Sequence, residues 1–106
     1  MKYVRTNFGK IFDENAWKAE VEYIKRYYPT TDIDSLIHSK GDTIKELCDV
    51  FIILYDGNKV STYDVFEDAL LVYKREEYAS ALLGGIVTDK EITFAAKYEK
   101  GELELL

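Results

Sequence analysis

Four short turn signals separate strand-like segments along the chain, and they constrain its fold more than any other feature. They lie at residues 7–10, 56–58, 88–90 and 99–101, and three of them contain glycine. Connections this short join antiparallel strands, because parallel strands require a crossover of about a dozen residues or more. The sequence therefore predicts a mainly antiparallel sheet.

The segments beside these turns have the composition of strands. Residues 2–6 and the pair Ile11 and Phe12 predict a small N-terminal hairpin, and the apolar run 51–55 with residues 59–62 predicts a second. Residues 81–87, 91–98 and 102–106 predict a C-terminal three-stranded meander. In its last strand leucines alternate with glutamates, so one face is expected to be apolar and the other wet.

Helical periodicity is clearest from about residue 14 onward, where Trp17, Val21, Ile24 and Tyr28 recur on one face. Asp13 or Asn15 is placed to cap the start of this helix, and Pro29 ends it.

Two further helices are expected from capping-box spacings. Thr43 and Glu46 have this spacing at the start of a short helix over residues 44–48, and Asp64 and Glu67 have it at the start of a helix that ends near Arg75. Residues 30–40 fit either a strand or a helical turn. The predicted fold class is α+β, with about three helices packed on a mainly antiparallel sheet that ends in the meander.

The chain is expected to form a single domain over residues 1–106, with 47% hydrophobic residues and one proline. It has no apolar stretch long enough for a transmembrane helix and no signal-peptide core, and its one cysteine cannot form an internal disulfide. We therefore expect a cytoplasmic protein that does not bind membranes.

The formal net charge of −6 opposes direct binding to nucleic acid. The charge is uneven along the chain. Nine acids and eight bases occur up to residue 53, whereas eleven acids and six bases follow it.

Catalytic and metal-binding patterns are sparse. One histidine, His38, and one cysteine, Cys48, are too few for a zinc site, and neither lies in a recognisable nucleophile motif. Cys48 is expected to be a small buried apolar residue, and His38 a surface residue. Gly84 and Gly85 match no phosphate-binding loop and favour a bulge or close packing in a strand. We therefore predict a protein without cofactor or metal that is not an enzyme.

The nine tyrosines and the acids of the second half are the stronger candidates for function. Tyrosine combines a large contact area with a polar tip and is enriched in interface hot spots. Many of these residues are expected to cover core edges or solvated faces. The candidate interaction surface comprises Tyr27, Glu67, Asp68, Tyr73, Glu76, Glu77 and Tyr78.

Three segments resemble small uncharacterised proteins encoded by phages and prophages of Gram-positive bacteria. They are residues 2–6, residues 41–49, and a C-terminal part made of residues 85–90, 95–97 and 100–106. The resemblance covers about a third of the chain and implies a mobile genetic element as context. It carries no functional residue.

Together these observations favour a phage-type or prophage-type accessory protein that acts as a non-enzymatic binding module for a host or phage protein. A specialised form is an inhibitor of a host defence nuclease that uses its acidic surface. The alternatives are a self-associating structural protein, with a homodimer formed through the C-terminal strand, or a small-ligand-binding protein or enzyme.

Overall fold

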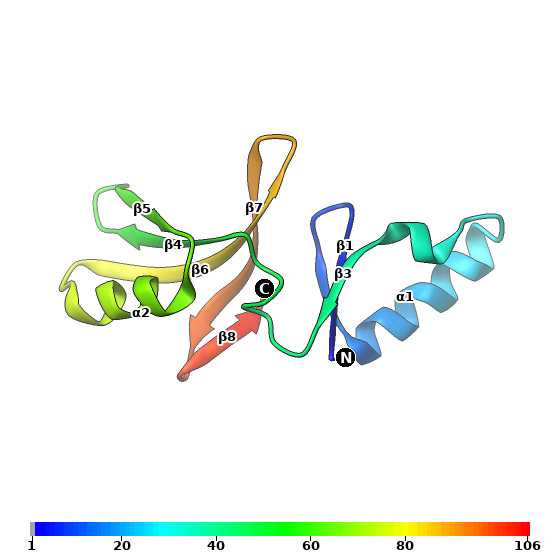
Figure 1. Cartoon of the computed structure of the whole chain (residues 1–106), viewed down its shortest axis with the longest axis horizontal. Helices are drawn as coiled ribbons and strands as arrows, with labels where there is room; N and C mark the ends of the chain where they lie inside the picture. The colour runs from blue at the N-terminus through cyan, green and yellow to red at the C-terminus, as the bar shows by residue number, and fades with distance from the viewer. Residues whose placement is uncertain (1) are drawn as a thin grey trace.

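The computed structural model describes residues 2–106 and shows an α+β fold with two antiparallel sheets (Figure 1). The first sheet has the strand order β2-β1-β3 and the second has the order β5-β4-β6-β7-β8. The elements in chain order are β1 (Tyr3–Thr6), β2 (Ile11–Asp13), α1 (Glu14–Tyr27), the 3₁₀ turn η1 (Ile33–Leu36), β3 (Ile37–Gly41), β4 (Val50–Tyr55), β5 (Val60–Tyr63), α2 (Phe66–Arg75), β6 (Ala79–Thr88), β7 (Glu91–Glu99) and β8 (Glu102–Leu105).

The two sheets are built from the same topological unit. In each unit a hairpin is followed by a helix, and the next strand returns to pair antiparallel with the first strand of the hairpin. The first unit comprises β1, β2, α1 and β3, and the second comprises β4, β5, α2 and β6. The second unit is then extended by β7 and β8, which complete the predicted meander.

The first unit begins as its sequence predicts. The hairpin pairs Val4 with Phe12, and the Asp13 side chain caps α1 by accepting a 2.8 Å hydrogen bond from the Ala16 amide. Trp17 packs on the Phe12 ring at 5.5 Å between centroids, and both are buried with Val4. The segment 30–40, for which a strand or helical turn was expected, contains both, since η1 leads directly into β3.

The expected helix over residues 44–48 is wrong, so the described residues contain two α-helices and not about three. Thr43 and Glu46 do meet through a 3.0 Å hydrogen bond between their side chains, but the chain makes only a turn, closed from Leu47 to Ile44. Ile44 and Leu47 are nevertheless buried as expected. A turn is enough to bury these side chains because they pack between the two sheets, against residues of the neighbouring strands.

The second unit buries one face of its sheet under two different covers. Ala69 of α2 packs on Phe51, Ile53 and Leu82 at one end. At the other end, Ile11 of the first unit packs with Ile86. We call this side the covered face.

The predicted Asp64 cap of α2 is not formed, because the helix starts after Val65 without a side-chain cap.

Gly84 and Gly85 form the expected irregularity in β6, where the register with β7 shifts between them. A Cβ atom on Gly84 would lie 2.7 Å from the Cys48 Sγ, and one on Gly85 would lie 2.8 Å from Ile92 Cγ2. Both positions therefore require glycine for close approach on opposite faces of the sheet.

The units are joined end to end by a polar clamp. Arg5 of β1 is 7% exposed and donates to both carboxylate oxygens of Asp49, at 2.8 and 2.9 Å, and to the Leu47 carbonyl. Asp49 also accepts from the Val87 amide of β6 at 2.8 Å. The result is an elongated molecule of 50 × 27 × 19 Å, with a radius of gyration of 15.4 Å against the ~13 Å typical of this length.

Candidate interaction surfaces

The side of the second sheet opposite the covered face carries neither helix. Cross-strand partners share a face, so the register places Val50, Ile52 and Leu54 of β4 on this side. It continues with Val60, Leu83, Val87, Ile92 and Phe94. We call these eight residues the open face. Val60 is 61% exposed and Phe94 47%, whereas Ile52 and Leu83 at the centre are buried.

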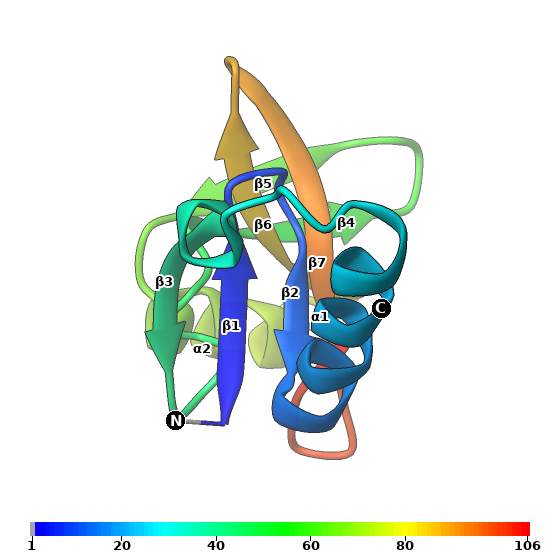
Figure 2. The same cartoon turned by 90° about the vertical axis from the view of Figure 1, so that its right-hand side faces the viewer.

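Three of the eight residues of the open face, Val87, Ile92 and Phe94, lie on a projecting hairpin. β4 pairs with β6 only as far as Gly85, and β8 pairs with β7 only from Ala96 onward. The distal part of β6 and β7 therefore extends as a two-stranded ribbon beyond its neighbours, beside the tip of the β1–β2 hairpin (Figures 1 and 2). On this ribbon Val87 and Ile92 are paired and both are exposed.

A hollow of about 330 Å³ lies between the two hairpins. It is bordered on one side by Phe8 and Ile11 and on the other by Phe94, with Leu106 at one end. β2 pairs with β1 alone, and residues 91–94 of β7 pair with β6 alone. Two strand edges without partners among the described residues thus border one hollow. We call it the hairpin groove.

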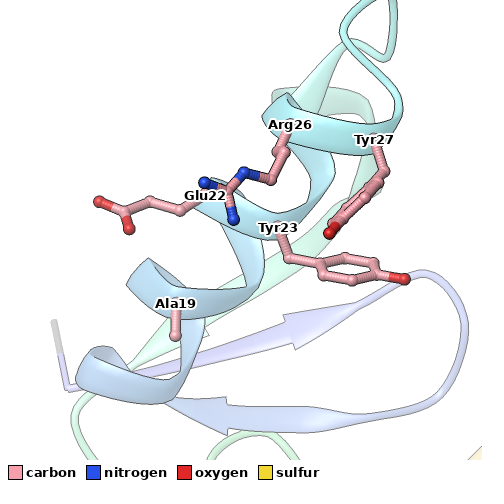
Figure 3. Close-up of a pocket in the computed structure, with 5 residues that line it drawn as sticks. All are labelled: Ala19, Glu22, Tyr23, Arg26 and Tyr27. Atoms are coloured by element: carbon pink, nitrogen blue, oxygen red, sulfur yellow. The ribbon is translucent and has the colours of Figure 1, made fainter.

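A second hollow lies on the outer side of α1 (Figure 3). Tyr23 and Tyr27 extend from the same side of the helix with ring centroids 4.8 Å apart, and each is more than half exposed. Ala19, Glu22 and Arg26 complete the lining. The sequence identified Tyr27 as a candidate but did not pair it with Tyr23.

The four acidic candidates all lie on or beside α2. Lys45 donates to Glu67 at 2.6 Å, and this hydrogen bond holds the pKa of the Glu67 carboxyl below its usual value. Arg75 lies 3.5 Å from Glu76. Asp68 and Glu77 are exposed nearby. Two of the four acids, Glu67 and Glu76, therefore form ion pairs with neighbouring bases.

The three tyrosine candidates do not form one surface. Tyr73 packs against Tyr98 at 5.8 Å on the covered side of the sheet, so part of its ring belongs to the core. Tyr78 is exposed in the connection between α2 and β6. Tyr27 lies on α1 at the opposite end of the molecule (Figure 1). The structure thus brings the α2 candidates together and separates Tyr27 from them.

The one cysteine packs against the second sheet, and the one histidine lies at the surface. Burial raises the pKa of the Cys48 thiol to about 11, and its sulfur lies against the backbone of Gly84. A thiol with such a pKa is not a thiolate at neutral pH. His38 is exposed on β3, where its ring contacts the Ser39 hydroxyl at 2.9 Å. Within residues 2–106 no cluster of three or more histidine, cysteine or acidic side chains is arranged to hold a metal ion.

Sequence reasoning missed the open face and the hairpin groove. A signal was present in the alternation of Ile92 and Phe94 with Glu91 and Thr93, which marks one exposed strand face with apolar side chains. A second signal was Phe8, a large apolar residue inside a predicted turn. Neither reveals which face is left uncovered, because that depends on where the first unit packs.

Comparisons with models of known protein families, with curated proteins and with solved structures found no match for this chain. Among residues 2–106, no helix is both long and apolar enough to cross a membrane.

Proposed function

We propose that this protein is a non-enzymatic binding module that engages another protein through the open face and its projecting hairpin. The observation that carries the proposal is the set of exposed apolar side chains at Val60, Val87, Ile92 and Phe94 on one sheet face that neither helix covers. Val60 lies at one end of this face and the other three lie on the projecting hairpin, and exposed apolar patches are characteristic of protein interaction sites.

The contacts of the charged groups in the clamp and of the cysteine also support the proposal. Arg5 and Asp49 are engaged in joining the two units, and the raised pKa of Cys48 opposes a role as a nucleophile. The apolar centre of the open face, Ile52 and Leu83, adjoins the charged side chain of Lys97, which forms a 3.6 Å ion pair with Glu99. Desolvating such a centre costs little, whereas burying charges would be expensive.

The resemblance to phage and prophage proteins supports a partner in the cytoplasm of a Gram-positive host cell. The test is affinity capture from a host lysate at physiological salt, with the wild-type protein compared with Val87→Glu and Ile92→Glu. We expect a specific protein to be retained by the wild type and lost with both variants. Leu71→Glu is the matched control, because Leu71 is 68% exposed on α2, away from the open face. Equal capture by all four proteins would contradict the proposal.

The more specific proposal of a defence-nuclease inhibitor rests on the acidic surplus around α2. Two of the four candidate acids are already paired with bases, which weakens a continuous negative surface. Its test is a variant with Glu67→Gln, Asp68→Asn, Glu76→Gln and Glu77→Gln. Partner binding and its salt dependence should both fall if the acids mimic nucleic acid. Unchanged binding would exclude the mimic while leaving the binding module intact.

Self-association is the second candidate, and the open face favours it for a physical reason. Two copies of a chain with a net charge of −6 repel each other, so they approach best through an apolar surface. The terminal strand is less suited, because the hollow beside β8 is lined by Tyr3 and Asp13 of the first unit. Light scattering at tens of micromolar is the test. A dimer that Ile92→Glu dissociates supports this candidate, and a monomer rules it out.

A further inference from the structure

The hairpin groove combines two features that occur together in sites for extended peptides. The first is an unpaired strand edge, here residues 91–94 of β7, which continues the line along which β8 already pairs. The second is a lined hollow directly beside that edge. In strand addition the main-chain hydrogen bonds supply affinity, and hollows that receive alternate side chains supply specificity.

From this arrangement we infer that the hairpin groove accepts an extended segment of a partner protein, which pairs with β7 beyond the end of β8. The inference rests on the proposed binding function and specifies the chemistry of the partner. The Leu106 amide already donates to the Ala95 carbonyl at 3.1 Å, so the chain itself shows the direction in which a strand lies on this edge. The added segment takes the next positions along β7.

The lining of the groove defines the side chains that fit. Phe8, Phe94 and Leu106 are each about half exposed or more, and they surround the hollow with apolar surface. Lys10 is the one charged residue of the lining, and its ammonium group lies 4.7 Å from the centre of the Phe12 ring. The partner segment is therefore apolar at alternate positions and carries a carboxylate for Lys10.

The free edge of β2 also favours binding of an extended segment in this groove, as opposed to contact with a flat apolar surface of a partner. Ile11 of β2 lies on the far wall of the same hollow, and its strand also has only one partner. The Gly9 turn packs against Thr88 of the β6–β7 hairpin, where a Cβ atom on Gly9 would lie 3.2 Å from the threonine methyl group. This contact braces the two hairpins, so the groove is formed before any segment binds, and less conformational entropy is lost on binding.

The test uses the full chain and short capped peptides that alternate valine with threonine and contain one glutamate. Binding is followed by titration and by the backbone amide resonances of the ¹⁵N-labelled protein. We expect the amides of residues 91–94 and 8–11 to shift. Methylation of alternate peptide nitrogens, which removes hydrogen-bond donors, should weaken binding at least about tenfold, equivalent to ~1.4 kcal/mol.

Two protein variants locate the binding. Lys10→Gln should weaken binding of the glutamate peptide but leave binding of a glutamine peptide unchanged. Phe8→Ser should weaken both, and its fold is checked by circular dichroism because Phe8 also contacts the Phe12 ring. Leu71→Ser is the matched control, since Leu71 is an exposed apolar residue of α2 that belongs to neither the open face nor the hairpin groove.

The outcomes separate this inference from the proposed function. Absence of peptide binding, insensitivity to methylation, or shifts confined to β5 or α1 would overturn the strand-accepting groove. If in that case Val87→Glu and Ile92→Glu still abolish capture of a host protein, the binding module stands and only its mode differs. If no protein is captured either, the proposed function fails as well.

Discussion

The two topological units differ in how many of their surfaces are covered. In the first unit, α1 packs on one side of the small sheet through Trp17, and the second unit covers the other side through Ile11. In the second unit, α2 and the first unit share the covered face, whereas neither helix packs on the open face, where Val87, Ile92 and Phe94 are exposed. The same strand and helix order thus produces one sheet that is packed on both faces and one sheet with a partly exposed face.

This difference shows that burial in such a molecule is decided by the contact between units and not by topology. β7 and β8 widen the second sheet beyond what α2 can cover, and the first unit fills the remainder of only one face. The contact depends on Arg5, a buried cation whose Nε atom has no hydrogen-bond partner among the described residues. The comparison between the units can therefore be tested by perturbing the core of the second unit and then the clamp.

The largest expected effect comes from the core of the second unit. Leu82→Ala removes a fully buried side chain and should lower the free energy of unfolding by about 3–4 kcal/mol. Trp17, the only tryptophan, reports on the first unit. If the units unfold together, its fluorescence and the circular dichroism signal will shift to lower urea in parallel. An unmoved Trp17 transition would show that the units are independent. Leu71→Ala, on the exposed side of α2, should change stability by less than about 0.5 kcal/mol.

The clamp is expected to have the next largest effect. Arg5→Ala removes the donor to the Leu47 carbonyl and leaves Asp49 with the Val87 amide alone. The cost should be about 2–3 kcal/mol, at or below the low end for a buried pair, because the Asp49 side chain is 36% exposed. The Trp17 and circular dichroism transitions should then separate. Arg5→Lys retains the charge but not the bidentate contact with Asp49. Its free energy of unfolding should therefore lie between those of the wild type and the alanine variant. Coincident transitions in Arg5→Ala would mean that apolar packing alone couples the units.

A smaller effect is expected at the glycine of the covered face. Gly84→Ala places a methyl group 2.7 Å from the Cys48 sulfur and should destabilise the protein by about 1–3 kcal/mol. In a Cys48→Ala background the sulfur is absent, so the same substitution should cost less than about 1 kcal/mol. Chemical denaturation of the four proteins in this cycle measures the difference. A penalty that persists without the sulfur would place the constraint in the backbone of β6.

The smallest effect is a dependence of stability on pH. Hydrogen bonds from Arg5, with a further one from the Val87 amide, hold the pKa of Asp49 below its usual value. A carboxyl whose pKa is lower in the folded state stabilises the protein above its unfolded pKa of about 4, and this stabilisation is lost as pH falls through the folded pKa. Thermal melts from pH 7 to pH 3 should therefore show a shallower decline for Asp49→Asn than for the wild type. Glu77→Gln, an exposed control, should keep the wild-type slope.

Local structure was predictable where short-range chemistry decides it. The turn signals and strand composition indicated both hairpins and the meander, and the Asp13 cap with the Trp17 periodicity indicated α1. The helix over residues 44–48 was wrong, although its apolar residues are buried as expected. The same apolar positions are buried by a turn that lies between the two sheets. Periodicity in a five-residue segment does not distinguish a short helix from such a turn.

The candidate surface was only partly predictable for a related reason. Residue type identified Tyr27 and the acids near α2 as exposed candidates, but it did not show that they lie at opposite ends of an elongated molecule. Residue type alone makes Tyr73 and Tyr78 equal candidates, yet Tyr73 packs on Tyr98 whereas Tyr78 is exposed. Tertiary contacts decide which aromatic residues remain at the surface, and a single sequence does not show them.

The sequence by itself determined the antiparallel pairing, the acid surplus of the second half and the scarcity of reactive side chains. The antiparallel pairing follows from the short turns, which act on neighbouring residues. The other two properties follow from residue counts, which do not depend on the fold. Only the tertiary structure decided that the sheet is divided in two, that Arg5 and Asp49 join the halves, and that Ile92 and Phe94 stay exposed. Each of these depends on contacts between residues far apart in the chain, whose partners are set by packing and not by neighbours in sequence.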